Sequence, residues 1–262
     1  MTIARFFVKP DAIQDSQVFI GDKGLISQIC KVLRLNHGSR VDILDGLGNL
    51  YQGVIKSISS SLIVLEINTK EKASGEPNIA VTVGMSLIKS GNFDLCVQKL
   101  TELGVSKIVP ITSQRCVIKV DEGLSRKMER WQSIAREASE QCERGAIPDI
   151  VPPQTLVSFA NMVAQHSFKF VCAERSQALS LTKKLDDICN HTDHPDRSVI
   201  DHSANVNRIS IAIGPEGGFT QEEISLLESF QFQKVSLGVR ILRSETAAMI
   251  ACAQAVSYFE PG

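Results

Sequence analysis

Two glycine-containing segments in the C-terminal half of the chain combine backbone freedom with charged side chains. The first reads RISIAIGPEGGFTQEEI over residues 208–224, and the second reads KVSLGVRILRSETAAMI over residues 234–250. In each segment an apolar run meets glycine and a helix-starting pattern follows, which predicts a turn between a strand and a helix. Ligands bind at this edge of open parallel sheets. Both segments are therefore candidates for a ligand site.

The charges of the first turn argue against a phosphate ligand. Free N–H groups and the positive end of a helix usually attract phosphate, but Glu216 stands in the turn and Glu222 and Glu223 follow it. The segment has neither G-x-G-x-x-G nor the Lys-Ser/Thr of a P-loop. Two interpretations remain, a ligand without phosphate, such as a cation, or a tight structural turn. We expect Thr220 to cap the helix, with Glu223 completing a capping box.

The second segment contains VRILR, in which two arginines flank two aliphatic residues. One interpretation is a buried loop in which Arg240 and Arg243 pair with carboxylates. The other is a pocket with an apolar wall of Ile241 and Leu242 and with the arginines facing a substrate. We expect Ser244 to be the N-cap of the following alanine-rich helix.

The sequence has two regions with different residue patterns, and these patterns predict the elements that position the two turns. Residues 1 to about 70 are short β-type runs separated by turn signals, which predicts a small, mostly β barrel. Within them, 25–35 has helical spacing that places Leu25, Ile29, Val32 and Leu33 on one face. Residues 69–78 are polar and are expected to be a linker. Strand and helix patterns then alternate, with strands near 79–88, 106–112, 168–173, 208–213 and 234–237, which predicts a largely parallel sheet covered by helices.

Composition limits the classes of protein that fit. The 262 residues are 43% apolar and 22% charged with a net charge of −1, so a nucleic-acid site would have to be a local basic patch. We see no signal peptide and no apolar run of membrane-spanning length. The seven cysteines include no C-x-x-C pair, and the histidines near 189–207 lack metal-ligand spacing. We expect a cytoplasmic protein with reduced thiols, no metal and no membrane association.

Several motifs in order resemble those of one known family. Two of these motifs are IGPEGGF and LGVRILRSETAA. Three more lie earlier in the chain: CKVLRLNHGSRVDILDGLGNLYQG, QKLTELGVSKIVPITSQRC and RWQSIAREASEQCER. Together they resemble the RsmE family of 16S ribosomal RNA uridine N3-methyltransferases, which belong to the SPOUT class. The resemblance implies a PUA-like β domain for RNA at residues 1–72 and an α/β domain with a trefoil knot at residues 73–262. It also implies a homodimer that acts on the small ribosomal subunit.

The resemblance further implies S-adenosylmethionine as cofactor, and a sulfonium cation without phosphate is compatible with Glu216. The matching motifs assign the cofactor site to Glu174, Gly214, Glu216, Gly217, Leu237, Gly238, Ile241 and Leu242. Glycines let backbone groups approach an adenine edge, and aliphatic side chains can cover its ring.

Methyl transfer to N3 requires removal of a proton or stabilisation of the developing anion. The candidates in the matching motifs are Arg243, Glu245, Gln141 and Arg144, with base and positioning roles left open. The RNA-binding candidates are Arg5, Lys9, Arg34, Arg40, Lys89 and Arg115. One departure is that Ser90-Gly91-Asn92 stands where the family usually shows a further basic residue.

An alternative function is a non-catalytic RNA-binding or ribosome-assembly protein that retains the fold. The intact GPEGG and LGVRILRSETA segments count against it. A nucleotide-dependent oxidoreductase would need the G-x-G-x-x-G fingerprint that the chain lacks.

Overall fold

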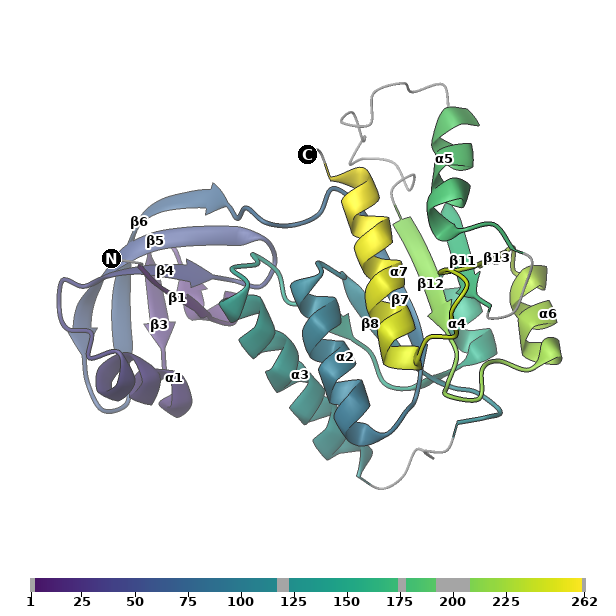
Figure 1. Ribbon diagram of the computed structural model, residues 1–262. Helices are drawn as coiled ribbons and strands as arrows, with labels where there is room; N and C mark the ends of the chain where they lie inside the picture. The colour runs from purple at the N-terminus through teal and green to yellow at the C-terminus, as the bar shows by residue number, and fades with distance from the viewer. Residues whose placement is uncertain (1–2, 117–122, 174–177, 192–207, 261–262) are drawn as a thin grey trace. The chain divides into compact units, whose positions relative to one another are not determined.

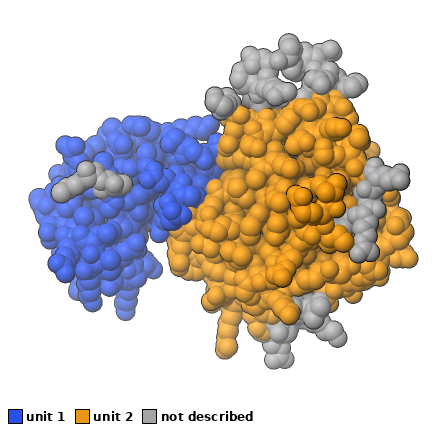
Figure 2. Space-filling model, in the orientation of Figure 1, with its two compact units in different colours: residues 1–76, 139–147 blue, residues 77–138, 148–262 orange. Residues whose placement is uncertain are grey.

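The computed structural model describes residues 3–116, 123–173, 178–191 and 208–260. They form a mixed α/β fold with two separate sheets (Figure 1). The chain divides into two compact units, coloured separately in Figure 2. Unit 1 comprises residues 1–76 and 139–147, and unit 2 comprises residues 77–138 and 148–262. The predicted cofactor residue Glu174 lies outside the described residues, and so do residues 192–207 of the segment that contains the histidines.

Unit 1 is built on a six-stranded sheet in the order β1-β4-β5-β6-β3-β2. Only β1 and β4 pair in parallel; the other neighbours are antiparallel. The strands are β1 (Ala4–Phe7), β2 (Ile13–Gln14), β3 (Gln17–Ile20), β4 (Arg40–Leu44), β5 (Asn49–Ile58) and β6 (Ile63–Lys72), with a 3-10 turn η1 (Pro10–Ala12) before β2. Alternate apolar side chains of β1, β3, β4, β5 and β6 form one core cluster.

Strand β6 corrects the linker prediction. Residues 69–72 are part of β6 and pair with β5, so the linker expected at 69–78 begins too early. The polar side chains of this stretch stay exposed while its backbone completes the ladder, and for that reason apolar periodicity missed it.

The helical segment of unit 1 also differs from its prediction. Helix α1 (Lys23–Ser27) is followed by a π-helical turn η2 (Gln28–Val32), which inserts one residue into the winding. Ile29 is buried as expected, but Val32 is 72% exposed and Leu33 is 43% exposed. The apolar face expected from α-helical spacing is therefore wrong at these two positions.

Unit 2 contains a seven-stranded sheet in which all neighbouring strands are parallel, as the alternating pattern predicted. Its order is β10-β8-β7-β12-β11-β13, with β9 also paired to β8. The strands are β7 (Ala80–Ser86), β8 (Lys107–Thr112), β9 (Asp149–Ile150), β10 (Gln154–Thr155), β11 (Phe168–Cys172), β12 (Arg208–Ile213) and β13 (Gln233–Val235).

Helices cover both faces of this sheet, as is usual for parallel sheets. They are α2 (Ser90–Glu102), α3 (Leu124–Gln141), α4 (Leu156–Met162), α5 (Leu181–His191), α6 (Gln221–Ser229) and α7 (Ser244–Phe259). Side chains of α4 and α6 share a core cluster with β8, β11 and β12. On the other face α7 packs on β7 and β12 between α2 and α5, and Figure 1 shows α2 and α7 side by side.

Helix α3 is fixed to α2 by Trp131, the only tryptophan of the chain. Its ring centroid lies 4.6 Å from that of Phe93, and its Nε1 donates a hydrogen bond to Asp94 Oδ1 at 3.1 Å. Trp131 is thus a core residue of unit 2 whose polar edge is satisfied.

Candidate functional site

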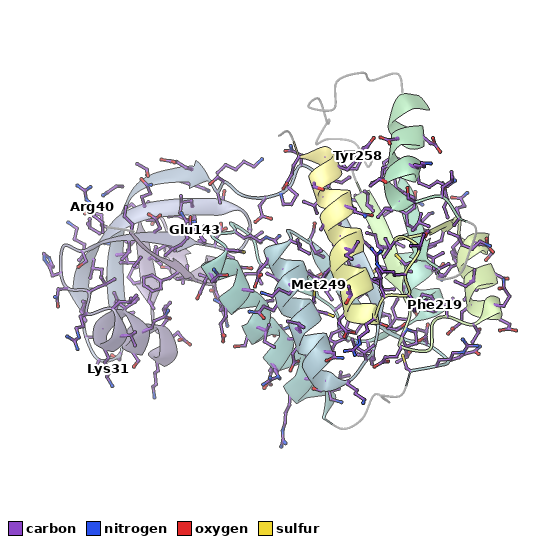
Figure 3. The ribbon with its side chains drawn as sticks, viewed as in Figure 1. Lys31, Arg40, Glu143, Phe219, Met249 and Tyr258 are labelled. Carbon is purple, nitrogen blue, oxygen red and sulfur yellow. The ribbon has the colours of Figure 1, made fainter. Side chains whose placement is uncertain are left out.

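The two glycine-containing segments follow β12 and β13, at the carboxyl edge of the unit 2 sheet. Residues 214–219 join β12 to α6 and residues 236–243 join β13 to α7, and here they are called the first loop and the second loop. The loop after β8, residues 113–116, ends at the same edge because β7, β8, β11, β12 and β13 run in parallel. Figure 3 labels Phe219 at the end of the first loop.

The first loop is a tight turn that requires glycine. Gly218 has φ +66° and donates its N–H to the Pro215 carbonyl at 2.8 Å. A Cβ at Gly214 would lie 3.0 Å from the Phe219 nitrogen, closer than nearly all real Cβ contacts. Glu216 and Gly217 are exposed, so the turn presents a carboxylate and bare backbone to solvent.

Glu223 holds the first loop to the loop after β8. Its side chain accepts hydrogen bonds from the backbone N–H groups of Gln114 at 2.7 Å and of Thr220 at 2.9 Å. Thr220 in turn caps α6, which confirms the predicted capping box. Because Glu223 is buried, these bonds form in a region of low dielectric and hold both loops in place.

Arg115 makes a second connection between the same two loops. Its Nη1 donates to the Gly217 carbonyl at 2.7 Å, and a Cβ at Gly217 would meet the Arg115 Cδ at 3.3 Å. Arg115 therefore supports the proposed cofactor turn, a role that its prediction as an RNA contact did not include. Glu222 faces this guanidinium, but the main cause of its lowered pKa is hydrogen bonding from its own backbone N–H.

The second loop is exposed, so the interpretation of VRILR as a buried loop is wrong. Val239 is 96% exposed and Ile241 is 58% exposed, and Arg240 and Arg243 face solvent. Within the described part of the chain neither arginine forms an ion pair.

The attachment of the second loop is local. Ser236 pairs with residues 179–181. The Ser236 N–H donates to the Leu179 carbonyl at 3.0 Å, and the Leu181 N–H donates to the Ser236 carbonyl at 3.2 Å. The Ser236 hydroxyl also accepts from the N–H of Gly238, whose φ is +124°. Leu237 and Leu242 are half-buried, so the loop presents partly covered aliphatic side chains beside its exposed ones.

Helix α7 begins at Ser244, and the N-cap residue is Arg243 in an extended conformation without a side-chain cap. The expectation that Ser244 is the N-cap is therefore wrong by one residue; Ser244 is buried in the first turn. Glu245 Oε1 lies 3.5 Å from Asn92 Nδ2, and Glu245 Oε2 is buried without a hydrogen-bond partner in the described structure. Asn92 belongs to Ser90-Gly91-Asn92, the stretch where the family resemblance implies a further basic residue.

Burial raises the pKa of three thiols, those of Cys96 in α2, Cys172 in β11 and Cys252 in α7. Burial raises the pKa of Cys172 to about 12, and burial followed by the nearby Glu245 carboxylate raises the pKa of Cys96 to about 12. Burial also raises the pKa of Cys252. Since the thiolate is the reactive form, burial lowers the reactivity of these three cysteines near neutral pH.

Gln141 and Arg144 belong to unit 1, whereas Arg243 and Glu245 belong to unit 2. Arg144 is 3% exposed, and its Nη2 and Nε donate to the two Glu76 carboxylate oxygens at 2.7 and 3.2 Å. Glu76 also accepts the N–H of Ala146 at 3.0 Å. In this chain Arg144 therefore holds residues 139–147 within unit 1, and Gln141 is an exposed residue at the end of α3.

The RNA-binding candidates fall into two groups. Arg5 is engaged: its guanidinium lies 3.5 Å from Asp42 Oδ2 and donates to the Glu143 carbonyl at 3.2 Å. Lys9, Arg34, Arg40 and Lys89 are exposed. Figure 3 labels Arg40 and Glu143 in unit 1.

The described residues contain no cluster of three or more histidines, cysteines and acids able to hold a metal ion. Among the described helices none is both long and apolar enough to cross a membrane.

Two family models match this chain. Residues 75–256 match the model of an RNA methyltransferase domain, and residues 29–68 match that of an RNA methyltransferase PUA domain. Ribosomal RNA small subunit methyltransferase E of Synechocystis sp. is 32% identical over 251 residues, covering 95% of this chain and 76% of its own. The enzyme of the same name from Bacillus subtilis is 27% identical, covering 97% and 96%.

A solved structure has the same fold over nearly its whole length. The Neisseria gonorrhoeae ribosomal RNA small subunit methyltransferase E, determined with S-adenosyl methionine bound, has a TM-score of 0.78 and 25% sequence identity, with 96% of each chain covered. On this evidence, the chain belongs to the ribosomal RNA small subunit methyltransferase E family, a family of RNA methyltransferases.

Proposed function

We propose that this protein transfers a methyl group from S-adenosylmethionine to N3 of a uridine in 16S ribosomal RNA of the small subunit. The observation that carries the proposal is the pair of glycine loops at one edge of a parallel sheet, in a chain of this family. The names of the relatives support the substrate class, and the bound ligand of the Neisseria structure supports the cofactor.

The residues of the two loops fit S-adenosylmethionine. The exposed Glu216 suits a cationic ligand, and the only cation bonded to the described first loop, Arg115, is occupied by a carbonyl. Ile241, Leu237 and Leu242 supply aliphatic surface for an adenine ring. A Cβ at Gly238 would meet no atom within 4 Å, so space exists beside that backbone. With Glu174, Gly214 and Gly217, these residues form the proposed cofactor site.

When bound, S-adenosylmethionine supplies an activated methyl group on a sulfonium. The chain must then orient the uridine and accept the N3 proton or stabilise the anion that forms. Arg243 is suited to the second role because its guanidinium is exposed and forms no ion pair with a described residue. Glu245, in the matching family motif, is the candidate for the first role, and it would have to expose its buried Oε2, which has no hydrogen-bond partner in the described structure.

Three architectural features belong to this proposal. Residues 1–72 act as a PUA-like RNA-binding barrel and residues 73–262 as the catalytic domain. A trefoil knot in residues 73–262 is proposed on the family resemblance. The half-buried apolar residues of α7, such as Met249 and Ile250, support a homodimer. We also propose a cytoplasmic location, which the names of the ribosomal RNA methyltransferase relatives support.

The test is methyl transfer from labelled S-adenosylmethionine to small subunits purified from cells that lack the protein, followed by nucleoside digestion and mass analysis. One new N3-methyluridine is expected. A Gly217→Arg variant should lose cofactor binding, while Gly21→Arg, at a glycine with open space around it, should retain it. Cofactor binding with methylation of another base would overturn the N3 assignment. No binding and no transfer would favour the RNA-binding scaffold.

A further inference from the structure

We infer that Asn92, in the first turn of α2, is a positioning residue. Its side-chain amide holds one oxygen of the Glu245 carboxylate and leaves the other oxygen to accept the N3 hydrogen of the uridine. The inference deepens the proposed function and rests on it, since it concerns the same reaction. The placement of the two residues, the hydrogen bonding of Glu245 and a comparison with Glu223 support it.

Asn92 and Glu245 meet across two helices that begin at the carboxyl edge of the unit 2 sheet. Helix α2 comes after β7 and α7 comes after the second loop, and each residue lies in the first turn of its helix. Figure 1 shows the two helices side by side, and Figure 3 labels Met249, about one turn after Glu245 on α7. The contact therefore lies at the same edge of the sheet as the two glycine loops.

Within the described residues, the Asn92 amide is the single hydrogen-bond partner of the Glu245 side chain. Asn92 Nδ2 donates to Glu245 Oε1 at 3.5 Å, and Oε2 is buried without a partner. None of the described ion pairs includes Glu245, although Lys89 and Arg243 directly precede the two helices. Burial raises the pKa of Cys96 in α2, and the Glu245 carboxylate raises it further, which agrees with a carboxylate held between α2 and α7.

A partly buried carboxylate with one neutral partner is costly, because burial removes water and few protein donors replace it. An unsatisfied buried polar atom in a native structure calls for an explanation, and a catalytic role is one of the established ones. Structural carboxylates of this chain have more donors. Glu76, for example, accepts from two nitrogens of Arg144 and from the Ala146 N–H. The hydrogen bonding of Glu245 instead fits a group that gains a partner when substrate binds.

Glu223 shows how a fixed carboxylate is held at the same edge of the sheet. Both of its oxygens accept backbone N–H groups, at 2.7 Å from Gln114 and at 2.9 Å from Thr220. The Glu245 carboxylate has one contact, of 3.5 Å, with a side-chain amide. A single long contact with a neutral group orients the carboxylate without locking it. The carboxylate can therefore turn about this contact and bring Oε2 to a substrate.

Oε2 of Glu245 suits the hydrogen on N3 of uridine. An ionised carboxylate only accepts hydrogen bonds, and N3 carries a hydrogen in uridine but none in cytidine. In the reaction the proton moves from N3 to Oε2, and the electron pair of the broken N–H bond stays on N3 for the bond to the methyl carbon. Asn92 forms none of these bonds. It occupies Oε1, so that Oε2 is the oxygen presented to the base.

The decisive variant is Asn92→Ala in the full chain, assayed with S-adenosylmethionine and small subunits purified from cells that lack the protein. We expect kcat for methyl transfer to fall about tenfold, the effect of one hydrogen bond to a charged group. KM for subunits and Kd for S-adenosylmethionine should change by no more than about twofold, because the amide acts through Glu245. Asn92→Gln keeps the amide and should restore part of kcat.

A double-mutant cycle tests the contact without the reaction. Asn92→Ala should lower the urea midpoint of the wild type, since it leaves the Glu245 carboxylate without a donor. In a Glu245→Ala background the same substitution should lower the midpoint less. Equal shifts in the two backgrounds would show that the side chains do not interact, and they would overturn the inference.

Two matched controls separate positioning from damage to a helix. Asn161→Ala removes an asparagine of α4 whose Nδ2 donates to the Val157 carbonyl of the same helix, and it should leave kcat unchanged. Gly91→Ala alters the exposed position next to Asn92, where a Cβ meets no atom within 4 Å, and it should also leave kcat unchanged. A loss in either control equal to that of Asn92→Ala would contradict the role given to Asn92.

The outcomes for the inference and for the proposed function are distinct. If Asn92→Ala forms N3-methyluridine with the kcat of the wild type, the inference is overturned and the proposed function stands. If the wild type binds S-adenosylmethionine but forms no N3-methyluridine, the proposed function fails and the inference fails with it.

Discussion

The two glycine loops of unit 2 lie at the same sheet edge but are held in different ways. The first loop is held to the loop after β8 by hydrogen bonds. Glu223 accepts from the Gln114 N–H, 109 residues away in sequence, and Arg115 donates to the Gly217 carbonyl, 102 residues away. The second loop is bonded through Ser236 to residues 179–181 and then runs exposed through Val239 and Ile241. The first loop is therefore preformed, whereas the second loop presents apolar surface that a ligand could cover.

Because of this difference, the two loops should contribute unequally to the free energy of unfolding and to ligand affinity. A rigid turn contributes to the free energy of unfolding because its polar groups are buried and satisfied. An exposed aliphatic loop contributes little to it but gains when a ligand removes its surface from water. Side-chain truncation should therefore lower stability most at the anchors of the first loop and change ligand affinity most in the second, whereas the backbone of Gly238 is a separate case.

Glu223→Ala should have the largest effect on stability. It leaves the N–H groups of Gln114 and Thr220 without acceptors, the second of these being the Glu223 half of the capping box, and the two losses together cost about 3 kcal/mol. Urea unfolding measures the loss. The neighbouring Glu222→Ala, at an exposed carboxylate in the same helical turn, should leave the unfolding midpoint nearly unchanged. Equal losses in the two variants would contradict the role given to Glu223.

Gly238→Ala tests the backbone of the second loop. A φ of +124° is accessible to glycine but strained for alanine, so we expect a loss of about 2 kcal/mol or a rearranged loop. Gly91→Ala is the control, since Gly91 lies in α2 with open space around it and should gain about 0.5 to 1 kcal/mol. Thermal unfolding compares the two. A stabilised Gly238→Ala would show that the loop does not depend on this conformation.

Arg115→Ala should cost about 1 kcal/mol or less, because the hydrogen bond to the Gly217 carbonyl is partly exposed to water. Affinity for S-adenosylmethionine should fall as the first loop loosens, and Arg115→Lys should restore part of it. Calorimetric titration with the cofactor measures both. A loss of RNA affinity with no loss of cofactor affinity would return Arg115 to the RNA-binding group.

Ile241→Ser should change the free energy of unfolding least, by no more than about 0.5 kcal/mol, because the side chain is already exposed. Its dissociation constant for S-adenosylmethionine should nevertheless rise about tenfold, equivalent to about 1.4 kcal/mol. The same titration provides the measurement, with Val157→Ser, an exposed aliphatic residue of α4, as the control. An unchanged cofactor affinity would remove the second loop from the proposed site.

Local patterns in the sequence predicted much of the molecule. Alternating strand and helix signals gave the parallel sheet of unit 2, and the Thr220–Glu223 spacing gave the capping box that the structure confirms. The glycines in residues 208–224 and 234–250 predicted where both loops lie. These features depend on bonds between near neighbours, which residue type and spacing describe directly. Errors of one residue, as at Ser244, are usual at helix ends.

The tertiary structure decided which side chains the candidates contact. Arg144 bonds to Glu76 across 68 residues, Arg115 to Gly217 across 102 and Arg5 to Glu143 across 138. No periodicity encodes such pairs, because they depend on how the strands are ordered and which segments return to each unit. The π-helical turn that exposes Val32 and Leu33 is likewise an outcome of packing, since one inserted residue turns an apolar face outward. The sequence by itself determined the elements and the chemistry of the loops; only the fold decided which charges remain available for a substrate.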